Sequence, residues 1–217
     1  MIWLIVGVLV LAMAVVLFFL LRGNGDTPAE TPTPTATAIP TATPFGFREI
    51  FAAEMPLAGN LEEAIAGQAM GIGEVRTFTV DTIGVPLPAA LLSTIDQSEP
   101  TYLTLFGKPD GSKGRGFARK INDTVAAASA LTAWESTMAQ DLSGFLKITP
   151  SRAASPNFLN ATYQGVGIQY RNFADAFNSI DYAIVDLPDG SHYLVVTNTR
   201  DHMFGMIDRA VGAVPGK

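Results

Sequence analysis

The stretch from Ile180 to Asp208 reads IDYAIVDLPDGSHYLVVTNTRDHMFGMID and contains the pattern on which the fold depends. Two apolar runs, 180–187 and 192–199, flank a Pro-Asp-Gly-Ser turn, which predicts a β-hairpin. A helix is expected to begin near Thr199 or Asp201, because apolar residues then recur at helical spacing. The stretch therefore predicts a strand–turn–strand–helix unit.

The same succession occurs 79 residues earlier in the chain. Residues 101–107 and 115–121 flank another Pro-Asp-Gly-Ser turn, and Asn122 or Asp123 is expected to cap the following helix. The two ββα units could be a duplicated module, although this turn is also common in unrelated α+β folds. Either interpretation predicts the α+β class, with one antiparallel sheet and helices on one of its faces.

Four shorter segments complete the predicted domain, which spans residues 45–217. Asn60 is expected to cap a helix over 61–69. Alternating side chains predict a strand over 75–82 and extended structure over 161–173. One or two helical turns are expected within 88–95.

Residues 1–22 predict a single transmembrane anchor. The run from Ile2 to Leu21 has no charged side chain, and about 20 such residues span the hydrocarbon core of a bilayer. The alternative is a cleaved signal peptide, but that normally has a basic start, a shorter apolar core and a cleavage site of small residues. The lipid bilayer is therefore the first expected partner, and the cell membrane the expected location.

Residues 23–44 predict a Thr/Pro-rich linker that stays disordered. This segment alternates Thr or Ala with Pro and has too few large apolar residues to fold by itself. Such segments are typical of exposed stalks, which favours an extracytoplasmic domain. Arg22 alone, counted by the positive-inside rule, weakly favours the opposite orientation.

The composition limits the kinds of ligand and catalytic group that this chain can have. The net charge of −6 and the lack of a dominant basic stripe argue against nucleic-acid binding. Cysteine is absent, which excludes disulfides and thiol nucleophiles. His192 and His202 do not make a zinc site without a carboxylate placed by the fold, and no G-x-S-x-G motif is present. No cofactor, metal site or catalytic residue is predicted.

One local concentration of positive charge surrounds the first hairpin. Lys113, Arg115, Phe117 and Arg119 are the candidate surface-contact residues, because the last three alternate onto one face. Because the linker would hold the domain near the membrane, that face could contact lipid headgroups or an anionic wall polymer. The alternative is an edge strand that its charges keep from pairing with other chains.

The second half of the chain resembles a family. TYQGVGIQYRNF, IDYAIV and YLVVTNTRDHMFGMID, within residues 162–208, and AWESTM at 133–138 resemble segments of uncharacterised bacterial membrane-anchored proteins. Members of that family share one N-terminal helix, a low-complexity spacer and an α+β domain of unknown function. The resemblance implies this architecture and carries no activity.

Three functions are weighed. The favoured hypothesis is a non-enzymatic module displayed on a stalk, which binds an envelope protein or a wall component. A pilin-like or surface-filament subunit is the second, with the apolar helix in the filament core. An envelope hydrolase or transferase is the third, and it would need polar groups converging in one pocket.

Overall fold

A computed structural model describes residues 46–51, 54, 60–174 and 177–212. The predicted anchor (1–22) and linker (23–44) lie outside the described residues. No helix among those described is long and apolar enough to cross a membrane. The described residues all belong to one compact unit.

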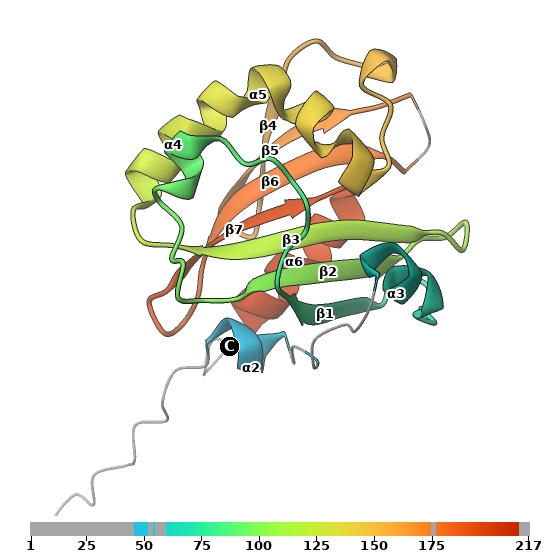
Figure 1. Ribbon diagram of the computed structural model, residues 1–217, viewed down its shortest axis with the longest axis horizontal. Helices are drawn as coiled ribbons and strands as arrows, with labels where there is room; N and C mark the ends of the chain where they lie inside the picture. The colour runs from blue at the N-terminus through green and yellow to red at the C-terminus, as the bar shows by residue number, and fades with distance from the viewer. Residues whose placement is uncertain (1–45, 52–53, 55–59, 175–176, 213–217) are drawn as a thin grey trace, which may run out of the picture. The chain divides into compact units, whose positions relative to one another are not determined.

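Seven antiparallel strands form one sheet in the order β1-β2-β3-β7-β6-β5-β4 (Figure 1). The strands are β1 (Val75–Val80), β2 (Thr101–Gly107), β3 (Lys113–Ile121), β4 (Leu159–Tyr163), β5 (Val166–Asn172), β6 (Ser179–Asp186) and β7 (His192–Thr197). The helices are α2 (Phe47–Ile50), α3 (Leu61–Gly67), α4 (Ala89–Leu92), α5 (Thr124–Leu146) and α6 (Arg200–Gly212), with a 3-10 turn at Pro150–Arg152. The predicted α+β class with an antiparallel sheet is confirmed.

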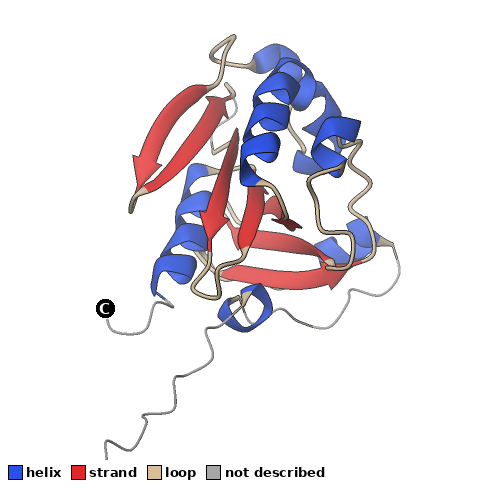
Figure 2. Ribbon diagram, turned by 90° about the vertical axis from the view of Figure 1, so that its left-hand side faces the viewer, coloured by secondary structure: helices blue, strands red, loops and turns tan. Residues whose placement is uncertain are grey.

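The expectation that helices cover one face of the sheet is wrong, because α5 and α6 lie on opposite faces (Figure 2). The first core contains Leu103, Phe117 and Val196 beneath α5. The second contains Tyr102, Val195 and the apolar side of α6. Every residue of β2 is buried, so both sides of the strand need a cover.

The two predicted hairpins have the same register. Tyr102 pairs with Ala118, and the residues 79 positions later, Asp181 and Thr197, also pair. The hairpins join through β3 and β7, where Phe117 pairs with Val196. A two-fold axis perpendicular to the sheet would therefore exchange the hairpins.

The helices after the hairpins break this symmetry. An axis perpendicular to the sheet keeps each face in place, whereas α5 and α6 cover opposite faces. The helix α6 already begins at Arg200, although the position equivalent to the start of α5 at Thr124 is Met203. The equivalence therefore covers the hairpins and does not extend to complete ββα units.

Helix caps form as the sequence predicts. The Asn60 side chain accepts from the backbone N–H of Glu62, and Asp123 accepts from that of Ala126, both at 2.9 Å. Helix α5 continues past Gly144, because Phe145 and Leu146 after it are buried. Lys147 ends the helix in the left-handed region, with φ 57°.

Candidate functional site: two pockets that share Lys108

The four predicted contact residues do not form one open surface. Phe117 is completely buried in the core beneath α5, so it is not available for surface contact. Arg119 donates to Thr101 Oγ1 at 2.7 Å, and burial lowers the pKa of its guanidinium. Lys113 and Arg115, near the turn, line a hollow. The predicted alternation of residues 115, 117 and 119 is real, but α5 packs on the face that they share.

The hollow at the turn end of β3, which we call the basic pocket, has a volume of about 390 Å³. Four cationic side chains line it: Lys108, Lys113, Arg115 and Lys147. They come from the turn after β2, from β3 and from the end of α5. None of the described residues that line this pocket is acidic.

Two carboxylates of the described residues compensate part of this charge, and one of them, Asp110, acts electrostatically on Lys108. Glu62, in the first turn of α3, forms ion pairs with Arg115 at 2.7 Å and with Lys147 at 3.1 Å. The hydrogen bond from Arg115 is the main cause that lowers the pKa of Glu62 to about 2. Lys113 instead donates to the carbonyl oxygen of Ala66 at 2.7 Å. An excess of positive charge therefore remains around the pocket.

Asn198 holds the wall of the basic pocket together. Its side-chain oxygen accepts from the backbone N–H of Arg115 at 2.8 Å, and its amide nitrogen donates to the carbonyl of Leu146 at 3.0 Å. That carbonyl belongs to the last turn of α5, where helix carbonyls need an external donor. Gly114 leaves the space for this bridge, because a Cβ there would lie 3.0 Å from Asn198 Oδ1.

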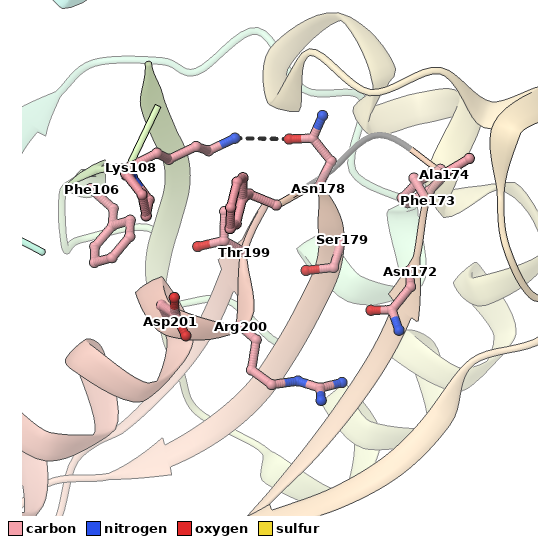
Figure 3. Close-up of a pocket in the computed structure, with 12 residues that line it drawn as sticks. Phe106, Lys108, Asn172, Phe173, Ala174, Asn178, Ser179, Thr199, Arg200 and Asp201 are labelled. Atoms are coloured by element: carbon pink, nitrogen blue, oxygen red, sulfur yellow. Dashed lines mark hydrogen bonds between the residues drawn. The ribbon is translucent and has the colours of Figure 1, made fainter. Parts of the chain in front are cut away.

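A second hollow, the α6 pocket, lies at the first turn of α6 and has a volume of about 370 Å³ (Figure 3). Its wall combines aromatic rings (Phe106, Phe173, Phe177) with polar side chains (Asn172, Ser179, Thr199) and the carboxylate of Asp201. In Figure 3, Lys108 meets Asn178 at one end of the pocket, while the Arg200 side chain extends toward the other end. Arg200 also lies over the ring of Tyr170, at 4.2 Å from its centroid.

Lys108 and Asn178 line both pockets. Lys108 is 5% exposed, and its ammonium donates to Asn178 Oδ1 at 2.8 Å. No carboxylate of the described residues forms an ion pair with it. Burial lowers the pKa of this ammonium. Because an ammonium has three donors, two remain for a ligand or for water.

Asp181 and His202 are buried groups close to the start of α6. Asp181 accepts from Ser179 Oγ through Oδ2, but its Oδ1 has no hydrogen-bond partner among the described residues. Burial raises the pKa of Asp181 to about 6. His202 stacks on Phe106, with ring centroids 5.5 Å apart, and burial lowers its pKa to about 3. The imidazole is therefore neutral at pH 7.

The other histidine lies at the opposite end of the hairpin. His192 Nδ1 and Asp186 Oδ1 are 2.6 Å apart across β6 and β7, and Asp186 is largely exposed. The neighbouring Ser191 donates to Asp189 at 2.5 Å and stabilises the turn. These residues do not form a serine–histidine–carboxylate relay. No cluster of three or more metal-ligating side chains occurs in residues 46–51, 54, 60–174 and 177–212.

No protein-family model, curated protein or solved structure matches this chain.

The sequence pattern indicates part of the site. The basic hairpin directs attention to Lys113 and Arg115, and both line the basic pocket. The roles of Lys147 and Asn178 are missed, because no local pattern places the end of α5 or the segment before β6 beside this turn. Lys108 and Asn178 are 70 residues apart, and only the order of strands brings them together.

Proposed function

We propose that this chain is a single-pass membrane-anchored protein whose domain is a non-enzymatic binding module for an anionic ligand. The observation that supports the proposal is the convergence of four cationic side chains on the basic pocket, with no acidic residue among its described lining. An anionic wall polymer is the ligand class that fits both the pocket and the proposed extracytoplasmic position.

The charge distribution favours binding at one place. The chain as a whole carries a net charge of −6, so a polyanion is repelled by most of the molecule and attracted to the basic pocket. Hydrogen bonds from cations to carboxylate, phosphate or sulfate oxygens are stronger than neutral ones. The unused donors of Lys108 suit such oxygens because no carboxylate of the described residues forms an ion pair with this ammonium.

Binding can be measured on the full chain in nanodiscs of uncharged lipid, with tripolyphosphate as the anionic probe. Lys113→Met and Lys147→Met each remove one charge from the basic pocket. Each should weaken binding about tenfold, the effect of losing one charge-assisted hydrogen bond. Lys120→Met is the matched control, because Lys120 pairs with Asp96 and Glu99 away from the pocket, each at 3.6 Å.

Two outcomes contradict the binding proposal. One is the absence of saturable binding of tripolyphosphate by the full chain. The other is an equal loss in the Lys120→Met control and in the pocket variants, because that result means general charge attraction and no localised site.

The proposed membrane position has a separate test. The run from Ile2 to Leu21 is apolar enough to anchor the chain, and the Thr/Pro segment after it suits a stalk outside the cytoplasm. A protease added to intact cells should then remove an epitope placed after Lys217. An epitope that is cleaved only after the cells are lysed contradicts the orientation.

A further inference from the structure

Phe177, at the wall of the α6 pocket, is an exposed aromatic residue with an unfavourable backbone conformation. Phe177 is 51% exposed, whereas the pocket's other two phenylalanines are each 6% exposed. Its φ of 62° lies in the left-handed region, which is unfavourable for a bulky residue. Strained backbone of this kind concentrates at ligand sites, so an exposed ring held there indicates a contact for a ligand.

The polar part of the α6 pocket suits a ligand rich in hydroxyl groups. Thr199 Oγ1 accepts from the backbone N–H of His202 at 3.1 Å, so its own hydroxyl hydrogen can be donated to a ligand. Ser179 donates to Asp181 and keeps lone pairs for accepting. Asn172 adds an amide that both donates and accepts. A hydroxyl group also does both, which matches this mixture better than a phosphate, which mainly accepts.

We propose that the anionic ligand is an acidic polysaccharide, with a hexuronate ring in the α6 pocket and its carboxylate at Lys108. The C–H face of the ring packs on Phe177, and neighbouring acidic units continue into the basic pocket across the Lys108–Asn178 bond. The volume of about 370 Å³ is in the range of small-molecule sites. This inference rests on the proposed function, because it names the ligand class for the same anion-binding region.

The test uses three probes on the full chain in uncharged nanodiscs: oligogalacturonate, a neutral malto-oligosaccharide of similar length, and tripolyphosphate. Oligogalacturonate should bind at least tenfold more tightly than the neutral sugar. Phe177→Ala should weaken oligogalacturonate binding by about fivefold and leave tripolyphosphate binding within about twofold.

Two further variants of Phe177 separate the ring from the backbone. Asn tolerates the left-handed region, so Phe177→Asn removes the ring while suiting the local conformation. It should weaken oligogalacturonate binding as much as Phe177→Ala does. Phe177→Trp keeps an aromatic face and should retain binding. An unchanged unfolding midpoint in each variant excludes a folding defect as the cause.

The outcomes distinguish this inference from the proposed function. Suppose that tripolyphosphate binds at the basic pocket while oligogalacturonate binds no more tightly than the neutral malto-oligosaccharide, or while its affinity is unchanged in Phe177→Ala. Either result means that the acidic-sugar inference is wrong and that anion binding stands. If no anionic probe binds, both are wrong. A loss of both oligogalacturonate and tripolyphosphate binding in Phe177→Ala also overturns the inference, because the ring then has no specific role with sugar.

Discussion

The ammonium of Lys108 donates to the side-chain oxygen of Asn178 at 2.8 Å, and this bond separates the basic pocket from the α6 pocket. Lys108 follows β2 and Asn178 precedes β6, so the contact joins two strands that are not neighbours in the sheet. Because Asn178 is neutral, it orients the ammonium without compensating its charge. The proposed ligand site is therefore centred on a cation that forms no ion pair with a carboxylate of the described residues, although Asp110 acts on it electrostatically.

Removing this cation should not destabilise the domain. Burial lowers the pKa of Lys108, which shows that the charged form is unfavourable in the folded state. Lys108→Met retains the aliphatic packing and removes the charge. The free energy of unfolding at pH 7, measured with urea, should stay equal or rise by about 1 kcal/mol. A decrease in the free energy of unfolding greater than about 1 kcal/mol would contradict this prediction, because it would mean that the charge of Lys108 stabilises the fold.

Asp181 should lower stability at neutral pH. Its folded-state pKa of about 6 lies above the ordinary value of 3.8. Between these two pH values, the folded protein holds a proton on Asp181 that the unfolded chain has lost. Stability from this group is complete below about pH 4 and is lost as pH rises through 6. Asp181→Asn should raise the free energy of unfolding at pH 7.5 by about 2 kcal/mol, with little change at pH 3. Urea denaturation at the two pH values checks this; no gain at pH 7.5 counts against it.

The effect of His202 on the pH dependence of stability should be opposite to that of Asp181. Its folded-state pKa of about 3 lies below the ordinary 6.5, and the nearby cations Lys108 and Arg209 add to the effect of burial. The unfolded chain therefore binds a proton below pH 6.5 that the folded protein does not. Stability falls as pH drops from 6.5 toward 3, by up to about 1.4 kcal/mol per pH unit. His202→Leu should flatten this slope in urea titrations, and an unchanged slope would show that other groups cause it.

Asn198 should be necessary for the stability of the domain. Asn198→Ala leaves the N–H of Arg115 and the carbonyl of Leu146 without their side-chain partner. The expected loss in free energy of unfolding is about 2–3 kcal/mol. Asn198→Asp keeps an acceptor for Arg115 but turns a buried carboxylate oxygen toward the carbonyl of Leu146, so a loss at least as large as that of Asn198→Ala is expected. Thermal and urea unfolding of both variants provide the measurement, and equal stability of Asn198→Ala and the parent contradicts the bridge.

The local structure could be predicted from the sequence because short-range chemistry determines it. The two Pro-Asp-Gly-Ser turns mark both hairpins, and the caps at Asn60 and Asp123 form as expected. The helix faces could not be predicted, because they depend on where α6 begins relative to β7. The burial of Phe117 could not be predicted either, because alternation identifies a shared face but not the helix that covers it.

The site was less predictable than the fold. Lys113 and Arg115 stand out as local positive charge, whereas Lys147 is an isolated lysine after a helix. Asn178 becomes meaningful only when the sheet order β2-β3-β7-β6 places the start of β6 near the turn after β2. Long-range contacts of this kind leave no periodic pattern in a single sequence.

The most direct test of anion binding is the affinity of Lys108→Met for oligogalacturonate and tripolyphosphate. The full chain in uncharged nanodiscs should lose about tenfold or more in affinity for both probes, because Lys108 lines both pockets. Its unfolding midpoint should remain at or above that of the parent protein. Unchanged affinity for both probes in the folded variant would contradict the assignment of the ligand site to Lys108.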